Sequence, residues 1–320
     1  MFELIEEKGY RETMEGVVEP ELAEIRREIE VSVEGGTLHA EAYTVPGAQR
    51  AVVVLHGYTE SAEKFREMIW YFLHDGFNVY AYDHRGHGRS VRAVADTSIT
   101  HVDRFEDYLR DMEKLMDALV LPETQGMTRV LYAHSMGGAV GALALMEHPE
   151  WFERAILTAP MIAASTGSFP RFAGKLIAGA MCALGKAKER AFVGKPFDPQ
   201  SETFENAVST GRARFEYYKE KRVKNAHLQN CSPSYRWVGQ SLAVTDRLLD
   251  RQNCAKIKTP LLLCQAALDT VVCLPEQKQF VDQVAGAQLR VFEAAKHEIY
   301  GSHDEVMREY VPAVLEFLSE

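Results

Sequence analysis

The sequence predicts an α/β fold: a mostly parallel sheet flanked by helices, with a mainly helical insertion. Short apolar runs rich in β-branched residues alternate with longer helical patterns, which is typical of strand–helix–strand crossover units. Two β-rich runs near the N-terminus flank a pair of glycines and predict an antiparallel hairpin at one edge of the sheet. Residues 161–248 break the alternation, because they hold helical patches and no convincing buried strand.

In the first half of the chain, the hairpin is expected over residues 24–33 and 37–45, with its turn at Glu34-Gly35-Gly36. Residues 51–55 (AVVVL) do not alternate between apolar and polar positions, which indicates a strand buried on both faces. Hydrophobic spacing then predicts a helix over 61–74, a strand over 77–82 and a helix over 102–119.

The second half continues the alternation, with strands expected over 128–132, 154–157, 260–264 and 289–292 and a helix over 136–147. Since residues 161–248 separate two of these strands, the simplest arrangement is an insertion above the strand ends. We therefore expect the first part of the core over 1–160, a helical cap over 161–248 and the second part of the core over 249–320.

Composition narrows the class of protein. The formal net charge of −10 argues against nucleic-acid binding, because no excess of lysine and arginine is available to neutralise phosphates. The five cysteines are scattered and form no CxxC pair, so neither a disulfide framework nor a zinc site is expected. The acidic N-terminus shows no signal-peptide pattern, and we expect a cytoplasmic protein. Residues 172–185 (FAGKLIAGAMCALG) are too few for a membrane span and fit a core or interfacial helix.

An isolated serine occupies the strand-to-helix turn Ala133-His134-Ser135-Met136-Gly137-Gly138. A helix cap would not need small residues two positions before and after it, whereas a strained turn that exposes a nucleophile does. Ala133 stands where the G-x-S-x-G pattern has its first glycine, and alanine is small enough to preserve the geometry. Ser135 is therefore the candidate nucleophile.

A serine nucleophile needs a base and a group that orients the base, in the chain order Ser, Asp, His for this kind of turn. Asp269 follows the expected strand over 260–264, and His297 follows the expected strand over 289–292. Ligands of an open parallel sheet bind beyond the carboxyl ends of its strands, where both residues lie. We expect His297 to act as the base and Asp269 to orient it.

The oxyanion of a tetrahedral intermediate needs backbone N–H donors. Met136 offers one, because it follows the nucleophile at a helix N-terminus. Tyr58, in the His56-Gly57-Tyr58 turn after an earlier strand, is the candidate for the second donor. The alternative is that this turn is an ordinary strand-to-helix connection.

Other polar residues near these turns are expected to be structural. Asp83, His84 and His87 in YDHRGHGRS are metal-ligating residue types, but the two histidines flank an Arg-Gly turn. Hydrogen bonds that shape this loop are the expected role, and no metal site is predicted. Glu60 and Ser61 are expected to lie in the first turn of the following helix or to cap it.

These motifs resemble those of the serine α/β-hydrolases, and within them the monoacylglycerol lipase and lysophospholipase L2 group. The resemblance rests on HGYTES, YDHRGHGRS, AHSMGGAV, the loop of Asp269 and AKHEIY. It extends to HVDRFEDYLRDM and SPSYRWVGQSL, which are more similar to the lysophospholipase branch. It covers nearly the whole chain and is weakest in the cap.

The resemblance implies an α/β-hydrolase fold, with Ser135 as nucleophile, His297 as general acid and base, and Asp269 as its orienting group. It implies a lipid ester as substrate, an acyl-enzyme intermediate, and glycerol or a glycerophosphodiester as the leaving group. It also implies that no cofactor or metal is required. A helical cap with an apolar groove for the acyl chain, and transient contact with a membrane surface, are further expectations.

Two other functions stay open at this point. One is a peptidase or small-ester hydrolase of the same fold, in which acidic cap residues such as Glu202, Glu205 and Glu216 would grip a free amine. The other is a non-catalytic ligand-binding protein, although such proteins usually lack one of the three catalytic residues, and here all three stand at their expected places.

Overall fold

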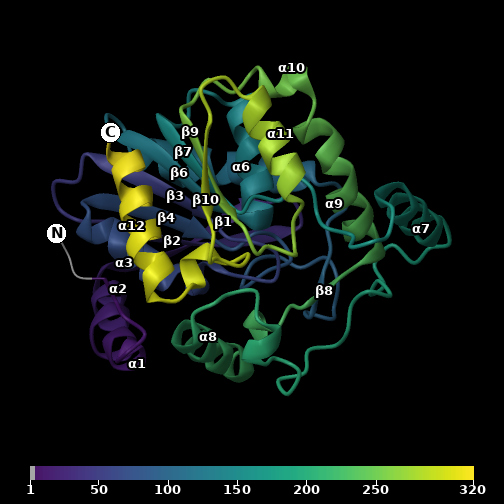
Figure 1. Ribbon diagram of the computed structural model, residues 1–320, viewed down its shortest axis with the longest axis horizontal. Helices are drawn as coiled ribbons and strands as arrows, with labels where there is room; N and C mark the ends of the chain where they lie inside the picture. The colour runs from purple at the N-terminus through teal and green to yellow at the C-terminus, as the bar shows by residue number, and fades with distance from the viewer. Residues whose placement is uncertain (1–3) are drawn as a thin grey trace.

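The computed structural model describes residues 4–320 and contains an eight-stranded sheet of order β1-β2-β4-β3-β6-β7-β9-β10 (Figure 1). β1 and β2 form the expected antiparallel hairpin at one edge, β2 is also antiparallel to β4, and the other pairs are parallel. The strands are β1 (Arg26–Val33), β2 (Gly36–Tyr43), β3 (Arg50–Leu55), β4 (Phe77–Tyr82), β6 (Thr128–His134), β7 (Arg154–Thr158), β9 (Leu261–Ala266) and β10 (Gln288–Phe292).

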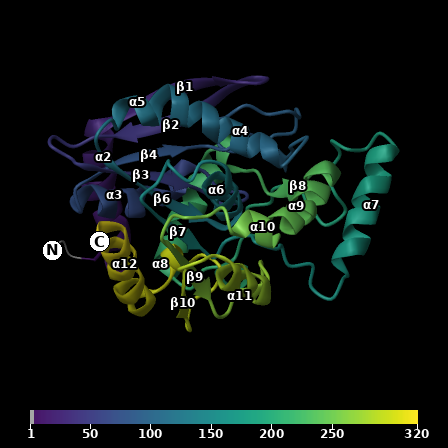
Figure 2. The same cartoon turned by 90° about the horizontal axis from the view of Figure 1, so that it is seen from above.

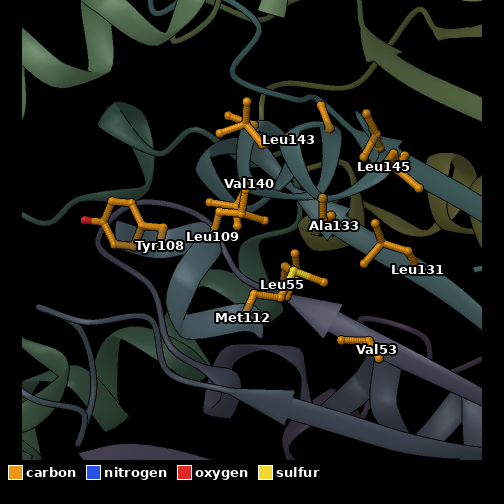
Figure 3. Packing of buried hydrophobic residues seen from close by; sticks show 14 of the residues in the cluster. Val53, Leu55, Tyr108, Leu109, Met112, Leu131, Ala133, Val140, Leu143 and Leu145 are labelled. Atoms are coloured by element: carbon orange, nitrogen blue, oxygen red, sulfur yellow. The ribbon is translucent and has the colours of Figure 1, made fainter. Parts of the chain in front are cut away.

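The sheet separates two hydrophobic layers. Val53 and Leu55 of β3 pack in one layer, whereas Val52 and Val54 pack in the other. Figure 3 shows the first layer, where side chains of β3 and β6 meet those of two helices. Burial on both faces explains why this strand shows no alternation in sequence. The covering helices are α4 (Glu106–Leu115), α6 (Ser135–Glu147) and α11 (Leu274–Gln283) on the first side, and α3 (Arg66–His74) and α12 (Asp304–Ser319) on the other.

The cap segment, residues 161–248, adds no strand to the eight-stranded sheet. It contains α7 (Arg171–Ala183), α8 (Arg212–Lys224) and α9 (Tyr235–Leu248), and its short strand β8 (Ser232–Pro233) pairs with β5 (Ile99–Thr100). In both views α7 lies at the edge of the molecule beside α9 (Figures 1 and 2). The structure describes all 13 residues of α7, and Ala178 is the one buried among them. The apolar stretch over 172–185 is therefore a surface helix and not a core helix.

The N-terminal segment differs from the expectation. It is helical through α1 (Tyr10–Thr13), a π-turn (Met14–Val18) and α2 (Glu19–Ile25), and β1 begins only at Arg26. The strand expected from residue 24 was therefore wrong at its start, and the helix was missed. Its buried stripe repeats every four residues and was readable from sequence. The stripe comprises Tyr10, Met14, Val18 and Leu22.

Within residues 4–320, no helix is both long enough and apolar enough to span a membrane.

Short elements connect the helices and strands described above. The short elements are α5 (Leu121–Glu123), α10 (Arg251–Cys254), the π-turn Met116–Val120, and the 3₁₀ turns Ala62–Phe65, Phe204–Asn206, Ala226–Leu228 and Ile299–Gly301.

Candidate active site

Ser135 lies at the tip of the turn between β6 and α6, with a φ of 52°, in the left-handed region that few non-glycine residues adopt. Gly137 makes this turn possible, because a Cβ there would lie 2.5 Å from the carbonyl oxygen of His56. Gly138 is equally constrained, since its Cβ would lie 2.6 Å from Cβ of Pro160. The two glycines let the start of α6 pack directly on the neighbouring loops.

Ala133 departs from the glycine of the usual pattern, and the structure shows how it fits. Its side chain is buried in β6 opposite Gly141 of α6. A Cβ on Gly141 would lie 3.2 Å from the methyl group of Ala133. The glycine on the helix therefore provides the space that the alanine on the strand takes up.

The structure brings Ser135, His297 and Asp269 together. Nε2 of His297 lies 2.8 Å from Oγ of Ser135, and Nδ1 of His297 lies 2.6 Å from Oδ2 of Asp269. The second oxygen of Asp269 accepts the backbone N–H groups of Val271 at 2.7 Å and Val272 at 3.2 Å. The Asp269 side chain is fully buried and only 6% of the His297 side chain is exposed, so the three groups are shielded from water.

The two candidate oxyanion donors flank the serine. Met136 is the second residue of α6, where a backbone N–H has no acceptor within the helix. In the loop after β3, the N–H of Gly57 already donates to Oε2 of Glu60 at 2.6 Å, which leaves that of Tyr58 as the candidate donor. Thr59 has a φ of 63°, so this loop is also strained.

Glu60 joins this loop to the loop of His297, a role that sequence reasoning missed. Its Oε1 accepts the Tyr300 hydroxyl at 2.5 Å and the Lys64 ammonium at 3.0 Å. Lys64 also contacts Oε1 of Glu298 at 2.5 Å. Burial by itself would raise the pKa of Glu60. Lys64 and the hydrogen bond from Tyr300 outweigh this effect and hold the pKa below its ordinary value, so the carboxylate is ionised. The i,i+4 spacing of Glu60 and Lys64 was the available signal. Ser61 stands at the N-cap position of the 3₁₀ turn Ala62–Phe65, as expected, but its hydroxyl makes no capping bond. Glu60 accepts the N–H of Gly57 and caps no helix within residues 4–320.

The cap segment contacts the loop after β3, which carries Tyr58, through an aromatic stack. The Tyr58 ring lies on the Trp237 indole of α9, with centroids 4.2 Å apart and planes inclined by 28°. The indole N–H of Trp237 donates to the Tyr108 hydroxyl at 3.1 Å, which fixes the indole against α4. The loop that carries one candidate donor is thus held from above by the cap segment.

Three buried histidines pack beside the loop after β3. Nε2 of His56 accepts the backbone N–H of His84 at 2.9 Å, and the His56 ring lies 5.2 Å from that of His87. Burial lowers the pKa of all three histidines, so they are neutral. Asp83 accepts backbone N–H groups of its own loop and of the turn before α3, in agreement with a loop-shaping role.

His134 directly precedes the candidate nucleophile Ser135 in the chain. Its Nδ1 is 3.1 Å from the carbonyl oxygen of Thr158, and its ring is 4.9 Å from that of His297. Burial lowers its pKa to about 3. His134 is therefore a neutral neighbour of His297.

One group within residues 4–320 has the geometry of a metal site: Glu28, His39 and Glu41 place a ligand atom each within 4.8 Å of one another. Both oxygens of Glu41 are already bound by the Arg66 guanidinium, at 2.6 and 2.8 Å, and Oε2 also accepts the Tyr43 hydroxyl. The Arg66 guanidinium thus occupies the place that a cation would need. The group lies on the β1–β2 hairpin and takes no part in the contacts around Ser135.

The family described as serine aminopeptidase, S33, matches this chain over residues 46–304, a range that contains Ser135, Asp269 and His297. The chain belongs to this family. It is therefore a hydrolase of the α/β-hydrolase superfamily, as the motifs predicted.

Relatives and solved structures agree with this assignment. The chain is 29% identical to lysophospholipase L2 of Escherichia coli K12, covering 84% of this chain and 80% of that protein. It is 25% identical to human monoglyceride lipase, covering 86% and 84%. A solved structure of monoglyceride lipase from Saccharomyces cerevisiae has the same fold, with a TM-score of 0.74 at 16% identity, covering 92% of this chain and 95% of that one.

Proposed function

We propose that this hydrolase cleaves the fatty-acyl ester of a lysophospholipid or a monoacylglycerol through an acyl-enzyme intermediate. The observation that carries the proposal is the continuous hydrogen-bond chain from Ser135 through His297 to Asp269. The substrate class is supported by relatives named lysophospholipase and monoglyceride lipase, which align with more than four-fifths of the chain.

In the proposed reaction, Nδ1–H of His297 donates to Asp269, so Nε2 is free to take the proton of Ser135. The serine oxygen attacks the ester carbonyl carbon, and His297 returns the proton to the oxygen of the leaving alcohol. His297 then takes a proton from a water molecule, which attacks the acyl carbon, and gives this proton to the serine oxygen as the fatty acid leaves. The N–H groups of Tyr58 and Met136 donate to the carbonyl oxygen as it becomes negative.

The ion pairs of Glu202 and Glu205 make a peptidase function less favourable than a lipid esterase. Glu202 forms an ion pair with Arg222, and Glu205 is exposed and lies 3.4 Å from Arg212. A free amine would have to compete with these arginines for Glu202 and Glu205.

We also propose that the protein is cytoplasmic and contacts a membrane surface transiently through α7. Exposed apolar side chains gather on this helix and its flanking loops, which is typical of an interaction surface. Residues 169–195 also carry six basic and one acidic side chain, in a chain whose net charge is −10. The exposed apolar residues are Phe169, Phe172, Leu176, Ile177, Leu184, Phe192 and Val193.

The test is release of product from lysophosphatidylcholine, lysophosphatidylethanolamine, monooleoylglycerol, p-nitrophenyl butyrate and proline-naphthylamide. Ser135→Ala is the control, together with labelling by a fluorophosphonate probe. We expect turnover of the lipids and a probe adduct on Ser135, both abolished in Ser135→Ala. Turnover of only the butyrate or the proline amide would refute the lipid assignment, and absence of any Ser135 adduct would refute the mechanism.

A further inference from the structure

We propose that the cavity between α8 and the loops of Tyr58 and His297 binds the polar head group of the substrate, with a phosphodiester held by Lys219 and Tyr218. This inference rests on the proposed function, since it specifies the leaving group of the same reaction. It selects a glycerophosphodiester ester, that is a lysophospholipid, over a monoacylglycerol.

The cavity has a volume of about 290 Å³, close to the lower end of the range for small-ligand sites. Its walls come from α8, the N-terminal helix, the loop over 201–209 and the two catalytic loops. Thr59 and Glu298 line it, and they directly follow Tyr58 and His297 in the chain. The cavity therefore borders the loops that carry Tyr58 and His297, although Ser135, Tyr58 and His297 are not among its lining residues.

The position of His297 places the leaving group on this side. His297 must give its proton to the oxygen of the departing alcohol, so that alcohol lies next to the His297 ring. Glu298, Tyr300 and Gly301 continue the chain from His297 and all line the cavity. An alcohol that extends beyond the scissile oxygen toward these residues enters the cavity.

The walls of the cavity offer charged groups for a polar head group. Six basic and four acidic side chains line it, beside apolar residues such as Met14, Met68 and Phe215. The basic residues are Lys64, Arg66, Arg214, Lys219, Lys221 and Arg222, and the acidic residues are Glu63, Glu67, Glu202 and Glu298.

Lys219 is the basic residue of this set that is least compensated. Within residues 4–320, each of the other five pairs with a carboxylate at 3.0 Å or less. The carboxylate paired with Lys219 is Glu216, at 3.9 Å, where the attraction is weak. About a quarter of the Lys219 side chain (26%) remains exposed. An anion in the cavity would find Lys219 free to pair with it.

The hydroxyl of Tyr218 is a second unsatisfied group on the same wall. It is buried and makes no well-formed hydrogen bond to any residue of the described chain, and the same is true of the neighbouring Ser61 hydroxyl. Leaving such a donor unpaired is costly, which suggests that a ligand or water completes it. A phosphate oxygen between Tyr218 and Lys219 would accept from both.

A free amine fits this cavity less well than a phosphate. The acidic groups nearest the catalytic loops are already neutralised, since Glu298 contacts Lys64 and Glu202 contacts Arg222. An ammonium ligand would have to displace one of these cations, whereas a phosphodiester needs only to approach Lys219.

The test compares Lys219→Ala and Tyr218→Phe with Lys224→Ala, a lysine on α8 that lies outside the cavity and whose side chain is 75% exposed. kcat/KM is measured for oleoyl lysophosphatidylethanolamine, monooleoylglycerol and p-nitrophenyl butyrate. Lys219→Ala should lower kcat/KM for the lysophospholipid about tenfold, the usual effect of losing a charged hydrogen bond. Tyr218→Phe should act in the same direction. The other two substrates, and all three with Lys224→Ala, should change less than about twofold.

Calorimetric titration with sn-glycero-3-phosphoethanolamine gives a readout that does not depend on turnover. We expect binding to the unmodified protein and to Ser135→Ala, and loss of binding in Lys219→Ala. If both lipids are cleaved but Lys219→Ala affects them equally and the head group does not bind, this inference is wrong while the proposed function stands. If neither lipid is cleaved yet the head group binds through Lys219, the proposed function is wrong, and the cavity is a phosphodiester site unconnected with this reaction.

Discussion

At the scale of single residues, the site depends on positions where only a small side chain fits. Gly57, Gly137 and Gly138 surround Ser135, and a Cβ on any of them would meet another atom within 3.0 Å. At Gly137 the colliding atoms are the carbonyl oxygens of Leu55 and His56, which belong to the backbone and cannot rotate away. The left-handed backbone conformation of Ser135 therefore depends on its small neighbours.

Gly137→Ala tests this dependence. The methyl group would push α6 away from the loop after β3, so we expect a loss of about 1–3 kcal/mol in the free energy of unfolding. Activity toward p-nitrophenyl butyrate should fall at least tenfold, because the Met136 N–H moves with α6. Denaturant unfolding and initial rates measure the two effects.

Gly179→Ala is the matched control, because Gly179 lies in helix α7 and its Cβ would meet nothing within 4 Å. This change should leave activity intact and stabilise the protein by up to about 1 kcal/mol through helix propensity. Equal behaviour of the two variants would contradict the steric explanation.

At the scale of elements, the strand ends and the cap meet at the serine. Ser135, Asp269 and His297 follow β6, β9 and β10 and meet beyond the carboxyl ends of these strands, while α9 covers the loop of Tyr58 through Trp237. Helix α7 lies apart from this arrangement, with an exposed apolar surface that the fold does not use.

Helix α7 should determine activity at a lipid surface. Phe172→Ser with Leu176→Ser removes two side chains that are each 67% exposed, so the fold should be unaffected. We expect weaker binding to anionic phospholipid vesicles in a flotation assay and unchanged hydrolysis of soluble p-nitrophenyl butyrate. Val17→Ser, which removes an exposed apolar residue of the N-terminal helix, is the control and should change neither. Unchanged vesicle binding in the double variant would refute membrane contact through α7.

At the scale of the whole molecule, buried histidines should make the folded state sensitive to acid. Burial lowers the pKa of His56, His84 and His87 below the ordinary value of 6.5. As pH falls below about 6.5, the unfolded chain therefore binds protons that the folded chain does not. The free energy of unfolding should decrease by up to about 1.4 kcal/mol per pH unit for each histidine.

Denaturant titrations between pH 8 and pH 5 measure this slope. His84→Phe keeps an aromatic ring among its neighbours and removes one titrating group. The slope of the unfolding free energy against pH should therefore decrease by up to about 1.4 kcal/mol per pH unit, the contribution of one proton. A free energy of unfolding that is constant down to pH 5.5 would contradict the buried, neutral state of these residues.

Much of the sheet and the candidate site was predictable, because periodicity and strand ends are local signals. Ser135, Asp269 and His297 each follow a recognisable strand, and the order of strands brings them together. The contact between Glu60 and Tyr300 was not predictable, since 240 positions separate the two residues and neither lies in a motif that requires the other. The packing of the cap segment was not predictable for the same reason, since it depends on contacts between residues far apart in the chain. The N-terminal helix, by contrast, was missed although its stripe was present in the sequence.

The stack of Tyr58 on Trp237 has an optical consequence. The chain has three tryptophans, and one of them lies in van der Waals contact with the loop that is proposed to stabilise the oxyanion. Replacing Trp70 and Trp151 with phenylalanine would leave Trp237 as the sole indole emitter. Its fluorescence would then report any displacement of the cap relative to the catalytic loop during turnover, without an added label.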